Sequence, residues 1–330
     1  MSLRHYVDML ADRRRIEGFR QGLAGVVQPG DKVLEVGTGL GTYAFFAARA
    51  GAAHVWAVDR DPVIHAASMV CKTNGLHDRI TFLRGEMSEL ELPELVDLVV
   101  FEDLPTRLFD DRTWRLVRDV LRQHLRPGGR VFPTRMRLNL GLATGPEPEA
   151  LVGLGDLERL TAFDLDWSCL RPYLANAPRQ ASLSRDALVA NHLVGPELSL
   201  DPLPTTEQLT LEAEWTLDRD VTIHGLVMWF DVLLGPDQWY QNAPGQDDSV
   251  WGQTLLPVSP PLNVPAGGQV RASVHPEPLL DGAPGWLSWA VEYGTDTRSG
   301  HEFAAEPSSL QDLYGDTLSI RAAETLRSGE

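Results

Sequence analysis

The sequence predicts an α/β domain built on a parallel sheet, followed by an antiparallel β-domain. Residues 31–59 show the succession of strand, glycine-rich turn, helix and second strand that is typical of a nucleotide-binding unit. Strand and helix patterns then alternate as far as Pro133, which indicates a parallel sheet with helical crossovers. Beyond Pro133, runs of alternating apolar and polar residues between Pro and Gly clusters indicate antiparallel strands.

The chain begins with a predicted helix over residues 1–23. Its apolar residues recur at three- to four-residue spacing, as one face of a helix requires. These residues are Tyr6, Met9, Leu10, Ile16, Phe19 and Leu23. The turn Gln28-Pro29-Gly30 ends this region before the first strand. We therefore expect residues 1–25 to form a helical segment, and residues 26–133 to form the α/β domain.

A glycine-rich loop is the most informative motif in the chain. The apolar run 33–36 stops at three glycines in alternate positions, and a helix-compatible stretch, 42–50, follows. The glycines are Gly37, Gly39 and Gly41. Glycine lets the backbone turn sharply and approach a ligand closely. The next apolar run ends in Asp59, about 20 positions further on, where an acid can accept hydrogen bonds from ribose hydroxyls. These features predict a Rossmann-like domain.

The surroundings of these glycines indicate which nucleotide is bound. Their G-x-G-x-G spacing differs from the G-x-G-x-x-G of dinucleotide folds, and no Gly-Lys-Ser/Thr follows to hold phosphate and magnesium. Glu35, just before the turn, would repel a pyrophosphate but suits a ligand with an ammonium or sulfonium group. S-adenosylmethionine has both groups, and its ribose suits Asp59. The alternative is a structural turn in an unrelated α/β protein.

The rest of the α/β domain places an acid at its ligand-binding edge. The remaining elements are strands at residues 80–84, 96–102 and 130–132, a helix over 113–124 and a helix start at Asp61-Pro62. Ligands bind beyond the carboxyl ends of parallel strands. Glu102 closes the strand 96–102, so we expect its carboxylate to face the cofactor crevice.

The second domain, residues 134–330, is expected to be an antiparallel β-barrel or sandwich. Residues 209–217 alternate apolar and polar side chains, residues 221–234 form a longer β-rich run, and residues 286–292 alternate again. The region 146–204 is mixed in pattern and partly helical.

Composition restricts the function classes. The net charge of −17 disfavours nonspecific nucleic-acid binding. Cys71 and Cys169 lie far apart and outside metal-ligand spacing, so we expect buried thiols and no metal site. No apolar run approaches membrane-spanning length, and the N-terminus has no apolar signal core. We therefore expect a cytoplasmic enzyme with no membrane partner.

Several motifs, in their order along the chain, resemble the protein arginine methyltransferases over nearly its whole length. They are Met9-Leu10-x-Asp12-x-x-Arg15, Glu35-x-Gly37-x-Gly39, the strand 96–102, Leu125-x-Pro127-Gly128-Gly129-x-x-x-Pro133 and Trp251-x-Gln253-Thr254. The resemblance implies an S-adenosylmethionine-dependent N-methyltransferase with a C-terminal β-barrel. It also implies a head-to-tail homodimer, with a helical dimerisation arm within residues 146–204.

The resemblance also implies roles for individual residues. Arg15 would pair with the methionine carboxylate of the cofactor, whereas Met87 and Ser88 fall where the family contacts adenine. Ser88 replaces an acid, and the nearby Glu86 and Glu89 leave open which residue contacts adenine. The complete cofactor set is Arg15, Glu35, Gly37, Gly39, Gly41, Asp59, Met87 and Ser88.

Two catalytic acids are implied in the same way. The family holds a guanidinium between two glutamates of one loop, and their positions here fall on Glu102 and Asp111. Because aspartate is one methylene shorter than glutamate, we expect a wider or differently shaped pocket. The alternative for Asp111 is an acid that favours the start of the following helix.

Two departures from the family leave the substrate open. The loop after Glu102 lacks the family's Met-Gly-Tyr and contains Arg107 instead. The family's Thr-His-Trp loop reads Ser249-Val250-Trp251, although its histidine normally pairs with an acid of the N-terminal helix, here Asp12. Asp12 must therefore pair with Arg15 or a barrel residue, or remain solvated. The substrate could be a protein, a peptide or a small-molecule amine or guanidine. The alternatives are a natural-product methyltransferase and a non-catalytic descendant.

Overall fold

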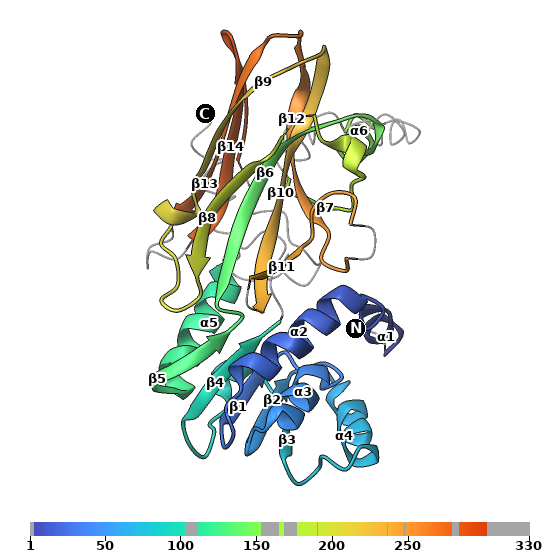
Figure 1. Ribbon diagram of the computed structural model, residues 1–330. Coiled ribbons are helices and arrows are strands. Elements are labelled where there is room, and N and C mark those ends of the chain that lie inside the picture. The colour runs from blue at the N-terminus through green and yellow to red at the C-terminus, as the bar shows by residue number, and fades with distance from the viewer. Residues whose placement is uncertain are drawn as a thin grey trace.

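The protein consists of a parallel-sheet domain and a domain of antiparallel sheets (Figure 1). A computed structural model describes residues 3–102, 111–152, 165–167, 177–189, 191–235, 237–246, 249–278 and 284–301. Among these residues, no helix reaches the length and hydropathy needed to cross a bilayer.

The first domain is a five-stranded, fully parallel sheet in the order β3-β2-β1-β4-β5. Its strands are β1 (Lys32–Val36), β2 (His54–Asp59), β3 (Ile80–Arg84), β4 (Val96–Phe101) and β5 (Leu125–Phe132). The chain builds outward from β1 to β3, then returns to the other side of β1 with β4. Ligands of open α/β sheets bind where the strand order reverses in this way. The predicted parallel sheet is confirmed.

Four helices of this domain follow its strands. They are α3 (Thr42–Ala50), α4 (Ile64–Thr73), the short 3-10 helix η1 (Met87–Glu89) and α5 (Asp111–His124). The expected helix start, with Asp61 as N-cap and Pro62 as first residue, is two residues early, because α4 begins at Ile64 after the N-cap Val63. The Asp61 carboxylate accepts a hydrogen bond from the Val63 amide at 2.9 Å, and the Ile64 amide donates to the Asp61 carbonyl at 3.3 Å. These bonds form a tight turn before α4 begins.

The N-terminal segment differs from the single helix predicted over residues 1–23. It contains two helices, α1 (Leu3–Met9) and α2 (Arg13–Val26). The Asp12 side chain accepts a hydrogen bond from the Arg15 amide at 3.0 Å, which is the bond of a helix N-cap. The single-helix prediction is therefore wrong, because Asp12 starts a new helix within a continuous apolar pattern.

The second domain contains two antiparallel sheets, of order β7-β12-β10-β6-β8 and β15-β14-β13-β9, with β11 paired to β10. The first sheet has β6 (Arg135–Thr144), β7 (Arg179–Ala181), β8 (Leu193–Ser199), β10 (Val221–Gly235), β11 (Gln238–Gln241) and β12 (Gln253–Val264). The second has β9 (Leu211–Thr216), β13 (Gln269–Pro278), β14 (Pro284–Tyr293) and β15 (Asp296–His301). The short helices among the described residues of this domain are α6 (Pro146–Val152), η4 (Arg185–Ala187) and η5 (Glu207–Leu209).

The two antiparallel sheets share one apolar core. Buried side chains from both sheets belong to the same cluster. The Trp289 indole of β14 also donates a hydrogen bond to the Pro257 carbonyl of β12 at 2.7 Å, which ties the sheets together. The predicted antiparallel second domain is confirmed.

The predicted dimerisation arm is described only in part. Helix α6 begins the region 146–204, whereas its described later part contains the strands β7 and β8 of the six-stranded sheet and the short 3-10 helix η4. Residues 153–164 and 168–176 lie outside the described residues, and the arm stays a prediction.

Helix α2 lies between the two domains and packs against both, on α3 of the first and on β10 and β11 of the second (Figure 1). Phe19 is fully buried and stacks on Tyr43 of α3 with a centroid distance of 4.4 Å. It also meets Phe132 at the end of β5 edge-on at 5.5 Å. Gly22 has no room for a side chain, because a Cβ there would overlap the Leu234 carbonyl oxygen of β10 and the Phe132 ring. The close approach of α2 to β10 therefore requires glycine.

We predict that Gly22→Ala destabilises the protein by about 1–3 kcal/mol, the usual cost of overpacking a core. Gly25→Ala is the matched control, because Gly25 is exposed on the same helix and a Cβ there meets nothing within 4 Å. The control should be unchanged or up to about 1 kcal/mol more stable, since alanine favours helix. Urea unfolding measures both variants. Equal stability of the two would contradict the packing described for Gly22.

Candidate active site

The glycine loop and Asp59 meet at the carboxyl ends of β1 and β2. The loop turns through positive φ angles of 74° at Gly37, 53° at Gly39 and 82° at Gly41. The Gly39 amide donates to the Asp59 carboxylate at 2.7 Å, and the Asp61 amide donates to the other carboxylate oxygen at 2.8 Å. Each carboxylate oxygen can accept more than one hydrogen bond, so Asp59 keeps the capacity to bind hydroxyls.

Tyr6 of α1 covers the glycine loop and was missing from the predicted site. Its side chain is buried, and a Cβ at Gly39 would lie 3.1 Å from the Tyr6 ring. Tyr6 also hydrogen-bonds to Asp61 beyond the end of β2. The helical periodicity that identified Tyr6 as apolar gave no sign of these contacts, because it does not show which loop the helix covers.

Glu35 is buried and is the last but one residue of β1, two positions before Gly37. The Thr38 hydroxyl donates to its carboxylate at 2.6 Å. Burial raises the pKa of Glu35 to about 8, an effect that the hydrogen bonds from Thr38 and from the Ala44 amide only partly oppose. Burial disfavours the charged form of the Glu35 carboxylate. A cation bound nearby would act in the opposite direction and favour the ionised form.

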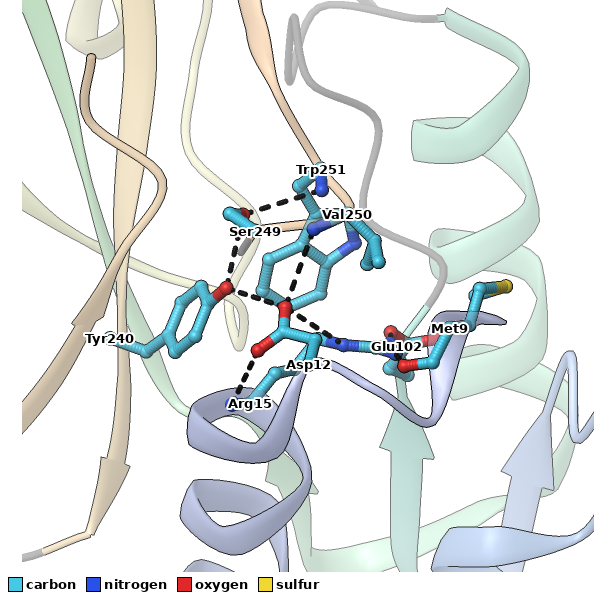
Figure 2. Close-up of polar contacts among 8 residues, drawn as sticks. All are labelled: Met9, Asp12, Arg15, Glu102, Tyr240, Ser249, Val250 and Trp251. Atoms are coloured by element: carbon cyan, nitrogen blue, oxygen red, sulfur yellow. Dashed lines mark hydrogen bonds and ion pairs between the residues drawn. The ribbon is translucent and has the colours of Figure 1, made fainter. Parts of the chain in front are cut away.

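Arg15 connects helix α2 to Glu102, the predicted catalytic acid (Figure 2). It is 2% exposed, and its Nη1 donates to Oε1 of Glu102, which follows β4 and is also buried. Its Nη2 donates to the Met9 carbonyl at 2.7 Å. The Trp251 ring lies 5.4 Å from the guanidinium. The sequence predicted a ligand carboxylate for Arg15 and did not anticipate the ion pair with Glu102.

Asp12 finds two of the partners that the sequence left open. Its Oδ2 accepts a hydrogen bond from the Tyr240 hydroxyl of β11 at 2.7 Å, and the Val250 amide lies 3.4 Å from the same oxygen. Arg15 Nε lies 3.6 Å from Oδ2 in a buried ion pair. Tyr240 was not among the predicted site residues, and it is 228 positions away from Asp12.

The remaining predicted residues are only partly described. Met87 is buried in η1, beyond the end of β3. Asp111 begins α5, but its side chain and that of Ser88 lie outside the described residues, as does the loop 103–110. The structure brings Arg15 and Glu102 together, whereas the pairing of Glu102 with Asp111 stays a prediction.

A hollow of about 520 Å³ lies away from this site, on the four-stranded sheet. It is lined by Glu212, Ala213, Glu214, Arg271, Ala272, Ser273, His275, Ala290 and Glu292. It contains none of the predicted site residues, so we place the chemistry at the glycine loop. Within the described part of the chain, no group of three or more His, Cys, Asp or Glu residues is arranged to hold a metal ion.

Comparisons with known proteins agree with this location. Residues 33–129 match the family model of a methyltransferase domain. The chain is 29% identical over 253 residues to protein arginine N-methyltransferase 1 of Schizosaccharomyces pombe, covering 74% of this chain and 73% of that protein. It is 31% identical over 270 residues to the probable histone-arginine methyltransferase CARM1 of Oryza sativa subsp. indica, covering 74% of this chain. The chain spans about half of that rice protein, 49% of its length.

Solved structures confirm the fold. A Trypanosoma brucei PRMT1 enzyme–prozyme heterotetrameric complex with AdoHcy matches with a TM-score of 0.74 and 23% identity, over 90% of this chain and 97% of that one. Arabidopsis thaliana protein arginine methyltransferase 10 matches with a TM-score of 0.69 and 18% identity, over 92% and 98%. Together with the sequence relatives, these matches confirm the resemblance to the protein arginine methyltransferases.

The raised pKa of Glu35 predicts a stability that falls as the pH rises. The folded protein keeps the Glu35 proton until about pH 8, whereas the unfolded chain releases it near the usual value of 4.5. Between these values the folded state binds more protons, so its free energy of unfolding decreases with pH, by about 1 kcal/mol per unit.

Glu35→Gln removes the titrating proton and keeps the side-chain shape. We expect the variant to gain stability relative to the wild type progressively from pH 5 to pH 8, as measured by thermal unfolding across this range. Parallel stability profiles of the two proteins would show that Glu35 does not titrate as described.

Proposed function

We propose that this chain, a relative of the protein arginine methyltransferases, is an S-adenosylmethionine-dependent N-methyltransferase that acts on a guanidinium or amine nitrogen of a cationic protein or peptide. The single observation that carries the proposal is the buried carboxylate of Glu102, held by Arg15 beside the glycine loop. Its position beyond β4 is where an open α/β sheet presents groups to a bound ligand.

The residues present fit the cofactor. Backbone amides of the glycine loop would contact it closely, Asp59 would accept its ribose hydroxyls, and Arg15 would pair with its carboxylate. Glu35, a carboxylate that burial drives toward its neutral form, would be stabilised in its charged form by the adjacent cation. Met87 and Ser88 would contact the adenine. When bound, the cofactor supplies a methyl group activated by a sulfonium.

Glu102 would hold and orient the substrate nitrogen. A carboxylate offers two oxygens with about four acceptor positions, so the contact of Arg15 with Oε1 leaves Oε2 for a substrate guanidinium. Asp111, at the start of α5, would supply the second acid. The two acids would orient one substrate nitrogen toward the methyl group that the bound cofactor supplies. Such positioning and charge placement contribute most of the rate of a group transfer of this kind.

The net charge supports a cationic peptide substrate, and a free cysteine supports a cytoplasmic location. The net charge of −17 favours positively charged partners over nucleic acid. Cys71 is a free, buried thiol, which suits the reducing conditions of the cytoplasm, where we propose that the protein acts.

We also propose a head-to-tail homodimer. Helices α1 and α4 lie on the same side of the parallel-sheet domain (Figure 1) and expose apolar side chains. Leu3 and Val7 of α1 are 56% and 49% exposed, and Met69 and Val70 of α4 are 70% and 41% exposed. Exposed apolar side chains of this size favour a protein partner. We assign to this surface the region 146–204 of a second copy.

The catalytic proposal predicts that Glu102→Gln reduces turnover by a factor of about several hundred, the scale of losing a positioning or electrostatic group. The purified protein, labelled cofactor and an arginine-rich peptide are combined, and mass spectrometry measures methyl transfer. Calorimetry with S-adenosylhomocysteine should show cofactor binding by the wild type.

The matched control is Glu94→Gln. Glu94 precedes β4 at the opposite end of the strand, where it is exposed and pairs with Lys32. It should retain full activity. Full activity of Glu102→Gln would remove Glu102 from the mechanism. Transfer to small amines but never to peptides would favour the natural-product alternative, and a wild type that binds no cofactor would overturn the enzymatic proposal.

The dimer proposal predicts that Met69→Glu together with Val70→Glu weakens self-association at least about tenfold, because the two substitutions place charges in an apolar interface. A tenfold change corresponds to only about 1.4 kcal/mol of binding free energy. Light scattering over a dilution series measures the dimer fraction. Leu95→Glu is the control, since Leu95 is 49% exposed but precedes β4, away from α1 and α4. A double variant that dimerises like the control would exclude α4 from the interface.

A further inference from the structure

We propose that Tyr240 is a positioning residue, whose buried hydroxyl holds Asp12, and through it Arg15, in place of the histidine that the family's Thr-His-Trp loop supplies. This inference rests on the proposed function. It starts from the observation that Val250 occupies the histidine position, although Asp12 is 1% exposed and needs a donor. A buried carboxylate without such partners is strongly destabilising.

The Tyr240 hydroxyl supplies this donor. Tyr240 lies on β11, is buried, and places its oxygen 2.7 Å from Asp12 Oδ2 (Figure 2). The Ser249 hydroxyl lies 3.0 Å from the Tyr240 oxygen. Because a hydroxyl both donates and accepts, the single phenol proton can go to Asp12 while Ser249 donates its own proton to Tyr240. Val250 contributes only its backbone amide, at 3.4 Å from Oδ2.

The protonated form of Tyr240 is strongly favoured in this environment. Burial raises the pKa of the phenol well above its ordinary value, and the adjacent Asp12 charge raises it further. Ser249, which hydrogen-bonds to Tyr240, and the Arg15 charge act in the opposite direction. The phenol therefore keeps its proton near neutral pH and remains a hydrogen-bond donor to Asp12.

Asp12 transmits this contact to the reactive end of the site. Its Oδ1 caps α2 by accepting the Arg15 amide at 3.0 Å, and its Oδ2 lies 3.6 Å from Arg15 Nε. Arg15 then donates to Glu102. One continuous chain of polar contacts therefore runs from β11 of the second domain to the end of β4 in the first.

The neighbouring aromatic ring fixes the same arrangement from another side. Trp251 meets the Tyr240 ring edge-on, with a centroid distance of 5.3 Å, and lies 5.4 Å from the Arg15 guanidinium. Tyr240 and Arg15 thus pack against one side chain as well as sharing Asp12. Loss of the phenol oxygen should shift Asp12 and Arg15 while leaving the aromatic packing in place.

The test compares Tyr240→Phe with the wild type by calorimetry with S-adenosylhomocysteine and by steady-state kinetics. We expect cofactor Kd and KM to rise about tenfold, as for the loss of a hydrogen bond to a charged group. We expect kcat at saturating cofactor to fall less than twofold. Tyr293→Phe is the control and should change neither quantity, because Tyr293 lies on β14, in a different sheet from Tyr240 of β11.

A double-mutant cycle with Asp12→Ala tests whether Tyr240 acts through Asp12. If it does, Tyr240→Phe should change cofactor Kd less than about twofold in the Asp12→Ala background, because the partner of the phenol is already gone. Equal losses in both backgrounds, or no loss in the wild-type background, would overturn the inference alone. A wild type that binds no S-adenosylhomocysteine would instead overturn the proposed function, and this inference with it.

Discussion

The buried charge cluster formed by Asp12, Arg15 and Glu102 is the constraint on which the rest of the arrangement depends. Ions removed from water require partners with good geometry, and removal of one partner leaves an uncompensated charge. Here the guanidinium of Arg15 meets Glu102, approaches Asp12 and donates to the Met9 carbonyl. Helix α2 is therefore held to the end of β4 by charge, and the start of the helix is held by the Asp12 cap.

Packing fixes the other end of the same helix. Gly22 lets α2 approach the backbone of β10 more closely than any other residue would allow, and Phe19 fills the space between α3 and the end of β5. Charge contacts act mainly at the first turn and apolar contacts act further along. Together they give α2 one orientation relative to both domains. Because α2 packs on α3, which begins directly after the glycine loop, the geometry of the site depends on the contact between domains.

The elements that could be predicted from sequence were those that depend on local pattern. The apolar runs of the parallel sheet, the glycine loop and the place of Asp59 at the end of β2 all follow from spacing within about 30 residues, the length of one βαβ unit. The break between α1 and α2 could not be predicted, since the apolar periodicity continues across it. An N-cap is recognised by the hydrogen bond that its side chain makes, here from the Arg15 amide to Asp12, and the residue type alone does not show that a helix begins there.

The site was predictable in its residue types but not in its contacts. Glu102 and Arg15 were both singled out, each with a ligand as its partner, yet the structure joins them to each other. The partner of Asp12 was left open because Tyr240 lies 228 positions away, and no local pattern connects a helix cap with a strand of the second domain. Long-range contacts of this kind depend on how the domains dock.

A phenol as the partner of Asp12 has an electrostatic consequence for the proposed chemistry. A protonated imidazole would contribute a positive charge beside Asp12, whereas the Tyr240 hydroxyl contributes only a hydrogen-bond donor. The cluster then contains the two carboxylates of Asp12 and Glu102 and the single guanidinium of Arg15. By formal charges, it carries one more negative than positive charge. In a buried site such an imbalance favours cations more strongly than it would in water. A sulfonium cofactor and a guanidinium substrate are both cations, so a neutral Tyr240 beside Asp12 suits the charge type that the proposed reaction uses.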